Sequence, residues 1–148
     1  MIKIVPDANI ILSGFLGYHS KPRKLINLAL AKKITLYGSE DTYREFIEKI
    51  NLPKFKKYIE RQVFTPEKLI VDYRTFVNMV EPTPAMKTPG IVPDDPDDDM
   101  YFWTAEACGS QILISGDSDL LRVKRYKSIR VLDVSSFLEI YSKIKQES

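Results

Sequence analysis

Apolar residues follow two alternating patterns along the chain. Short runs rich in Ile, Val and Leu predict β-strands, whereas longer segments with an apolar residue at every third or fourth position predict amphipathic helices. The predicted strands are residues 2–5, 34–37, 111–115 and 129–132. The predicted helices are residues 10–17, 20–29, 39–50, 54–61, 65–77, 98–108 and 136–144. Because strands alternate with helices, we expect an α/β fold, a three-layer α/β/α sandwich around a mostly parallel central sheet.

Glycines, prolines and capping residues set the expected boundaries of these elements. The first helix is expected to break at its glycines, and Ser20 and Ser39 are expected to cap the next two helices. Ser136 and Glu139 form a capping-box pattern at the start of the last helix. Residues 81–97 contain five prolines and are predicted to form a long loop. A loop of this length in a compact domain more often has a function than not.

The composition is that of an ordinary globular protein. Of the 148 residues, 44% are hydrophobic and 28% are charged, which predicts a single domain over residues 1–148. No apolar run approaches the roughly 20 residues that span a bilayer, so we expect no membrane partner. The N-terminus lacks the pattern of a secretory signal. The single Cys108 excludes a disulfide framework and favours a reducing, cytoplasmic location.

The formal net charge of +2 hides a strong asymmetry along the chain. Residues 1–93 carry 15 Lys and Arg against nine acids, and residues 120–148 carry seven against three. Residues 94–119 carry eight acids and neither Lys nor Arg. An acidic segment therefore interrupts a basic chain, so the whole-chain sum does not exclude a nucleic acid as the partner.

Two aspartates directly follow predicted strands. Asp7 follows the first strand, and Asp117 lies in the predicted loop 116–119 after the most apolar strand. In mostly parallel sheets, sites form at the carboxyl ends of strands, so we expect these side chains to meet there. Such carboxylates could bind a hard divalent cation, act as general acid and base, or only solvate a loop.

Other common chemistries find little support in the sequence. The only histidine, His19, has no G-x-S-x-G motif to accompany it and is expected in an exposed loop. Neither a P-loop nor a dinucleotide-binding glycine motif is present. A phosphatase of the haloacid dehalogenase type would have a second acid two residues after Asp7, where this chain has Asn9.

Four motifs, in this order, resemble those of the PIN domain family. They are VPDANII at 5–11, SEDTYREF at 39–46, DPDDDMYF at 95–102 and SGDSDLL at 115–121. Residues 131–138 resemble the C-terminal part of the family's sequences. Each motif alone is weak, but their order and spacing together are specific. The likeness is to a subgroup described as toxins of toxin–antitoxin pairs, similar to VapC-like ribonucleases.

The resemblance implies a PIN-like fold, hydrolysis of RNA with Mg²⁺ or Mn²⁺, a homodimer and an antitoxin protein as a partner. It implies roles for particular residues as well. The catalytic acids would be Asp7, Glu45, Asp98 and Asp117. The metal ligands would be Asp7, Asp98, Asp117 and, as an accessory, Asp119. The supporting residues would be Asn9, Ser115 and Asp99.

Two of these assignments depend on the helical period. Within the acidic run, Asp98 is preferred because Phe102 and Ala105 share its helical face, which should turn its carboxylate toward the strand ends. Asp97 or Asp99 remains an alternative, and Asp95 is expected to cap or solvate the loop. Glu45 lies off the apolar face of its helix, so the periodicity alone predicts a solvated residue and only the resemblance favours a site.

Basic residues near the acidic motifs could bind an RNA backbone. The candidates are Arg122, Lys124, Arg125, Lys54 and Lys57. The leading hypothesis is therefore a metal-dependent endoribonuclease. The alternatives are a non-catalytic module with this fold that binds RNA or protein, a metal-dependent nuclease acting on DNA, and a phosphatase acting on small esters.

Overall fold

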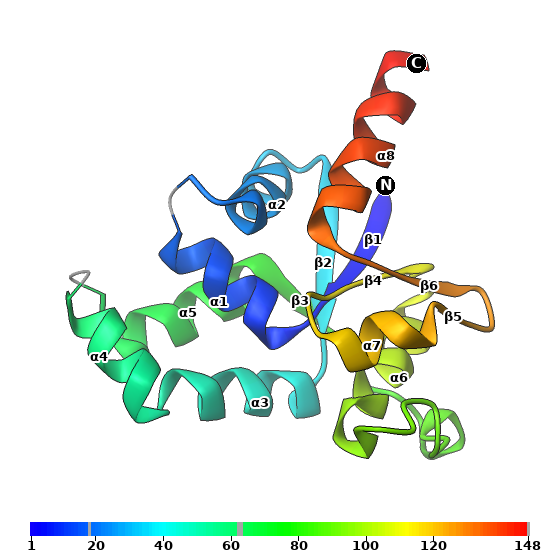
Figure 1. Cartoon of the computed structure of the whole chain (residues 1–148), viewed down its shortest axis with the longest axis horizontal. Helices are drawn as coiled ribbons and strands as arrows, with labels where there is room; N and C mark the ends of the chain where they lie inside the picture. Colours follow the sequence, from blue (N-terminus) through cyan, green and yellow to red (C-terminus); the bar gives the residue numbers. More distant parts are fainter. Residues whose placement is uncertain (18, 62–63, 148) are drawn as a thin grey trace.

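A six-stranded sheet forms the centre of the computed structural model, which describes residues 1–17, 19–61 and 64–147 (Figure 1). The strands are β1 (Ile2–Pro6), β2 (Ile34–Gly38), β3 (Val77–Met79), β4 (Ile112–Ile114), β5 (Arg125–Tyr126) and β6 (Ile129–Leu132). Their order across the sheet is β3-β2-β1-β4-β6-β5. Every neighbouring pair is parallel except β5 and β6. The predicted α/β class and mostly parallel sheet are confirmed.

Helices connect the strands and begin where the sequence provides caps. They are α1 (Ala8–Leu16), α2 (Lys21–Leu30), α3 (Glu40–Ile50), α4 (Pro53–Arg61), α5 (Pro66–Phe76), α6 (Asp99–Cys108), α7 (Ser118–Val123) and α8 (Val134–Glu147). The side chains of Ser20, Ser39 and Thr65 each accept a hydrogen bond from the backbone N–H three residues later, at α2, α3 and α5. Over the described ranges, no helix combines the length and apolarity that crossing a membrane requires.

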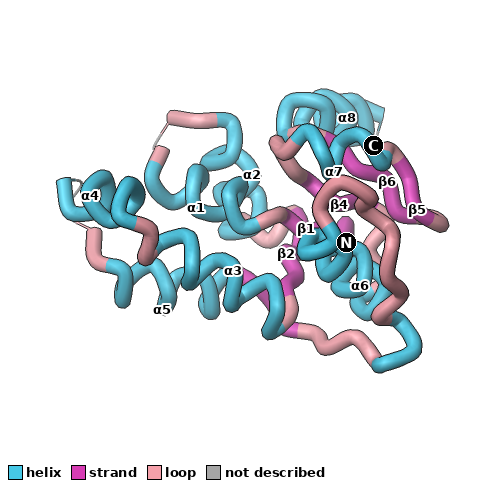
Figure 2. Tube along the Cα trace, turned by 60° about the horizontal axis from the view of Figure 1, so that its bottom comes forward, coloured by secondary structure: helices cyan, strands magenta, loops and turns pink. Residues whose placement is uncertain are grey.

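The sheet separates two hydrophobic cores because successive strand residues point to opposite faces. Ile4 belongs to the core shared with α1, α2, α3, α5 and α8, whereas Val5 belongs to the core shared with α6. Leu120 of α7 joins the second core. Figure 2 shows α1 to α5 on one side of the central strands and α6 and α7 on the other. The three-layer α/β/α arrangement is therefore confirmed.

The third strand departs from the prediction. Val77 was expected to be a buried position of a helix over 65–77, but α5 ends at Phe76 and Val77 begins β3. Val77 pairs with Leu36 of β2, and its side chain is buried in the first core. Pairing with β2 gives Val77 its extended conformation. The sequence did not predict this strand because three residues are too few to show a period of two.

Two helix boundaries are also corrected. Gly14 does not break α1: it lies inside the helix, where a Cβ would stand 2.6 Å from Ile26 Cγ1, so glycine allows α2 to pack closely. The last helix begins at Val134 and not at a Ser136 capping box. Asp133 caps it instead, because its Oδ1 accepts a hydrogen bond of 2.7 Å from the Ser136 N–H.

The predicted loop at 116–119 is shorter than expected, because Ser118 already begins α7. After this helix the chain forms the antiparallel pair of β5 and β6 at the edge of the sheet. The proline-rich segment 81–97 lacks strands, as predicted, and contains the short 3-10 turns Pro84–Met86 and the start of Pro96–Asp98. It leads directly into α6.

Candidate functional site

The register between β1 and β4 brings Asp7 next to Ser115. Pro6 pairs with Ile114, so the two residues that follow lie side by side at the carboxyl end of the sheet. Asp7 is only 4% exposed and caps α1: its Oδ1 accepts a hydrogen bond of 2.9 Å from the Ile10 N–H. The Ser115 hydroxyl donates to Oδ2 of the same carboxylate. Burial outweighs these hydrogen bonds and raises the pKa of Asp7 to about 6.

Asp117 is held at the same end of the sheet by similar local contacts. Its backbone N–H donates to the Ser115 hydroxyl at 2.9 Å, and its Oδ1 accepts from the Asp119 N–H at 3.1 Å, which caps α7. Ser115 therefore links the Asp7 carboxylate to the backbone of Asp117, 110 positions later in the sequence. That Ser115 orients the acids of a functional site stays a prediction, and these two hydrogen bonds are the contacts through which it would do so.

The three consecutive acids Asp97, Asp98 and Asp99 point in different directions. Asp98 is buried on the wall of the cavity that Asp7 lines, whereas Asp97 is exposed and lines a neighbouring hollow that Glu45 also borders. Asp99 accepts hydrogen bonds from the backbone N–H groups of Gly90 at 3.0 Å and Val92 at 2.7 Å. Asp99 thus anchors the proline-rich loop, and of the three acids Asp98 is the one that shares the cavity wall with Asp7.

Asp98 carries the strongest electrostatic signature of the acidic group. Burial raises its pKa to about 8, and the charges of Asp95 and Glu45, with a hydrogen bond to Asp117, act in the same direction. A carboxyl in this setting holds its proton well above the usual range for aspartate. Burial is therefore the main cause of this raised pKa, and the neighbouring carboxylates add to it.

Glu45 reaches the cavity because a buried tyrosine holds it. The Tyr101 hydroxyl donates to Glu45 Oε2 and accepts from the Ala8 N–H at 3.1 Å. Tyr101 is 1% exposed and lies one turn after Asp98 in α6. Burial raises the pKa of Glu45, while the Tyr101 hydrogen bond and Lys49 lower it. The partner of Glu45 thus comes from 56 residues away, which the period of α3 alone could not reveal.

These side chains surround a cavity of about 70 Å³. Its walls are formed by Asp7, Ala8, Asn9, Glu45, Lys49, Asp95, Asp98, Tyr101, Asp117 and Leu120. All four predicted catalytic acids lie on this wall, together with the exposed Asn9 in the first turn of α1. Sequence reasoning missed Lys49 and Tyr101 as members of the site.

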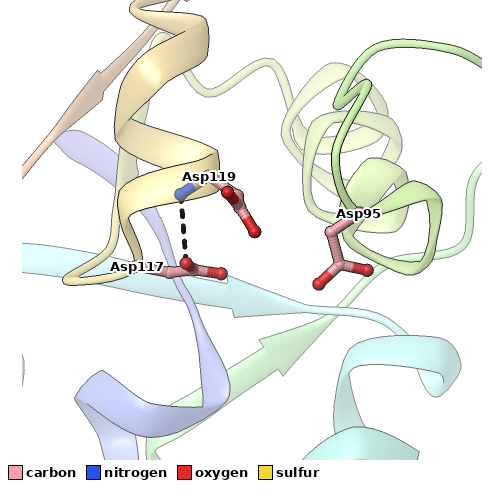
Figure 3. A group of neighbouring side chains, drawn as sticks. All are labelled: Asp95, Asp117 and Asp119. Carbon is pink, nitrogen blue, oxygen red and sulfur yellow. Dashed lines mark hydrogen bonds between the residues drawn. The ribbon is translucent and has the colours of Figure 1, made fainter.

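Asp95 belongs to a second, overlapping group of acids. Carboxylate oxygens of Asp95, Asp117 and Asp119 all lie within 4.8 Å of one another (Figure 3). Asp95 was expected to cap or solvate its loop, but its side chain makes no cap hydrogen bond. Clustered carboxylate oxygens are the donors that hard divalent cations prefer, so this set fits Mg²⁺ or Mn²⁺ chemically.

The five predicted RNA-binding residues lie outside the wall of this cavity. Arg122 on α7 forms ion pairs with Asp94 at 2.6 Å and Asp119 at 3.1 Å, next to the acids. Lys124 is the exposed residue that ends α7, and Arg125 is the exposed first residue of β5. Lys54 and Lys57 lie on α4, which Figure 1 shows at the opposite side of the molecule from α7. The predicted basic surface is therefore divided into two parts.

Comparisons with known proteins agree on one family. The PIN domain family matches residues 3–119. An uncharacterized protein of Methanocaldococcus jannaschii is 26% identical over 125 residues, which cover 83% of this chain and 76% of the relative. The solved structure of VapBC2 from Rickettsia felis, bound to a DNA fragment from its promoter, aligns with a TM-score of 0.59. That alignment covers 89% of this chain and 98% of the other at 12% identity, so it shows a shared fold.

Proposed function

The chain belongs to the PIN domain family, and from this premise we propose that it is a metal-dependent endoribonuclease. The observation that carries the proposal is the convergence of Asp7, Asp98 and Asp117 on one small cavity. These acids come from the ends of two neighbouring strands and from the residue that precedes α6.

A divalent cation, Mg²⁺ or Mn²⁺, would relieve the repulsion among these carboxylates. Burial raises the pKa of Asp7 to about 6 and that of Asp98 to about 8, so both ionised forms are disfavoured without a cation. We assign Asp7, Asp98 and Asp117 as the ligands because they share the cavity wall. Asp117 also belongs to the close group that it forms with Asp95 and Asp119, so these two acids would contribute at the edge of the site. A cation bound there would lower the pKa of a bound water molecule and polarise the phosphoryl oxygen.

The remaining residues of the site would position these groups and move a proton. Ser115 holds Asp7 and Asp117 in a fixed relation. Glu45, fixed by Tyr101, is placed on the same wall and would accept the proton of the attacking water. Its raised pKa brings this carboxylate closer to the range in which a general base works.

RNA is the proposed substrate, and a small antitoxin protein is the proposed partner, covering the acidic cavity. The second proposal draws on the VapBC2 complex, which has the same fold. A homodimer remains a prediction that the mass of the purified protein in solution would test.

The test is cleavage of labelled single-stranded RNA by the purified protein with Mn²⁺ or Mg²⁺. We expect cleavage that EDTA abolishes and that Asp7→Asn or Asp98→Asn lowers by roughly a hundredfold or more. Asp97→Asn is the matched control, because Asp97 is adjacent to Asp98 but exposed and outside the cavity wall.

Other outcomes of the same assay identify the alternatives. Cleavage of DNA alone would show a DNA nuclease, and hydrolysis of a phosphate monoester alone would show a phosphatase. Equal RNA binding with metal and with EDTA, without cleavage, would show a non-catalytic binding module. Each of these results would contradict the proposed ribonuclease.

A further inference from the structure

Among the described residues, Lys49 is the one cation on the wall of the acidic cavity. It lies one turn after Glu45 on α3, and its Nζ is 3.9 Å from Glu45 Oε1. Its side chain is 26% exposed, so it is partly withdrawn from water. Lys49 belongs to none of the basic clusters visible in the sequence.

The contact between Lys49 and Glu45 differs from an ordinary helical ion pair. Lys68 and Asp72 on α5 have the same spacing, yet they close to 2.9 Å with the lysine side chain 61% exposed. At 3.9 Å, the Lys49 ammonium attracts Glu45 without a hydrogen bond. The Glu45 carboxylate is already bound by Tyr101. This contact therefore leaves the N–H donors of Lys49 for another acceptor.

The charge of Lys49 acts on more than one carboxylate. It opposes the effect of burial on the pKa of both Asp7 and Glu45. The ammonium thus lies within electrostatic reach of both, on the wall where a reacting phosphodiester would have to enter. A phosphate approaching this wall would be repelled by its ionised carboxylates, and the Lys49 ammonium could offset that repulsion alongside a bound metal ion.

We propose that Lys49 is a phosphate-binding residue of this site, whose ammonium donates to a non-bridging oxygen of the RNA phosphate at the acidic cavity. Lysine is suited to this role because it acts as a compact point charge with three donors. The inference rests on the proposed ribonuclease function and adds the group that recognises the substrate backbone. It also separates this residue from the distant lysines of α4.

The experiment compares Lys49→Gln, Lys49→Arg and Lys68→Gln in single-turnover cleavage of labelled single-stranded RNA with Mn²⁺. We expect Lys49→Gln to lower the rate roughly ten- to a hundredfold, as for loss of a charged hydrogen bond. Lys49→Arg should retain most of the activity, and the matched Lys68→Gln should behave as wild type. Wild-type rates for Lys49→Gln would overturn the proposal.

Direct Mn²⁺ binding without RNA, measured from the spin resonance signal of the free ion, separates a substrate contact from a structural role. Because Lys49→Gln removes a positive charge, it should bind Mn²⁺ at least as tightly as wild type. A loss of Mn²⁺ affinity would mean that Lys49 builds the acidic site rather than binding phosphate, and it would overturn the proposal.

A third measurement distinguishes failure of this inference from failure of the proposed function. If wild-type protein cleaves no RNA, the ribonuclease proposal fails, and Lys49 is then judged by fluorescence anisotropy of the labelled RNA in Mn²⁺. In the Asp7→Asn background, the added Lys49→Gln change should weaken RNA binding severalfold. Unchanged affinity would overturn the assignment of Lys49 whatever the cleavage result.

Discussion

Helix α4 carries four cations within residues 53–61, whereas the acidic cavity collects its carboxylates from positions 7 to 117 of the chain. On α4 only Ile59 is buried, and the lysines point into solvent. In the cavity, Asp7 and Asp98 are nearly inaccessible, and their pKa values are raised. Charges that are adjacent in sequence are therefore dispersed, and charges far apart in sequence are brought together.

This difference has a physical consequence for stability. Water and salt screen exposed charges, so the helix keeps them at little cost. Buried carboxylates of like charge destabilise the fold unless they are protonated or bound to a cation. A region that costs stability and is still assembled from four separate segments is the stronger candidate for a functional site.

The largest expected effect concerns the stability of the metal-free protein as a function of pH. The folded-state pKa of Asp98 is about 8, above the ordinary value of 3.8, so the folded protein binds this proton more tightly than the unfolded chain. The Asp98 contribution should therefore favour folding as the pH falls from above 8 toward 4. In EDTA, Asp98→Asn should raise the free energy of unfolding at about pH 9 by on the order of 2 kcal/mol.

Urea denaturation across this pH range measures the effect. Asp98→Asn should flatten the pH dependence between about pH 5 and 9, while the exposed control Asp97→Asn should follow wild type within about 0.5 kcal/mol. If the metal-free Asp98→Asn protein is no more stable than wild type at high pH, ionised Asp98 does not destabilise the fold. The acidic cavity would then cost no more stability than the exposed charges of α4.

The next effect tests whether Glu45 depends on its buried partner. Tyr101→Phe keeps the packed ring but removes the hydroxyl between Glu45 and the Ala8 N–H. We expect RNA cleavage to fall about tenfold, because Glu45 loses a hydrogen bond that fixes its position. Tyr73→Phe is the matched control: Tyr73 is equally buried, and its hydroxyl contacts Thr42 away from the cavity.

A double-mutant cycle identifies the route of this effect. If Tyr101 acts through Glu45, Tyr101→Phe should change the cleavage rate little in a Glu45→Gln background. Additive losses in the double variant would show that the hydroxyl acts on something else. Thermal melting of each variant checks that the fold is retained.

The parts of the site that depend on regular structure could be predicted from the sequence. Asp7 and Asp117 follow apolar strands, and strand ends meet at one edge of a parallel sheet. Asp98 shares a helical face with Phe102 and Ala105, and the structure places it on the cavity wall. The ends of two strands and one helical period therefore carried the information for these three acids.

Residues placed by tertiary contacts could not be found in this way. The period of α3 does not predict that Glu45 is fixed at the cavity, because the tyrosine that binds it, Tyr101, lies on another helix. The position of Asp95 depends on the loop that Asp99 anchors through Gly90 and Val92. Lys49 lies outside the basic clusters of the sequence. Only its position four residues after Glu45 indicates that the two side chains could form an ion pair.

Short or competing local signals explain the errors in the fold. Strand β3 has three residues and α7 has six, which is too few for a period to be recognised. Two residues could cap α8, Asp133 and Ser136. Asp133 forms the cap, and the helix accordingly begins at Val134. These errors did not affect the predicted α/β class, because that prediction depended on the four longer strands and the helices that connect them.

The smallest expected effect belongs to α4 itself. In the double variant Lys54→Gln with Lys57→Gln, two exposed charges are lost, so the free energy of unfolding should change by less than about 0.5 kcal/mol. RNA affinity should fall only a few-fold at low salt, with a shallower salt dependence, because these lysines would contact the backbone without reaching the cavity. The cleavage rate at saturating RNA should stay at the wild-type value, in contrast to the loss expected for Lys49→Gln. A large fall in that rate would place α4 within the catalytic site and remove the distinction between the two regions.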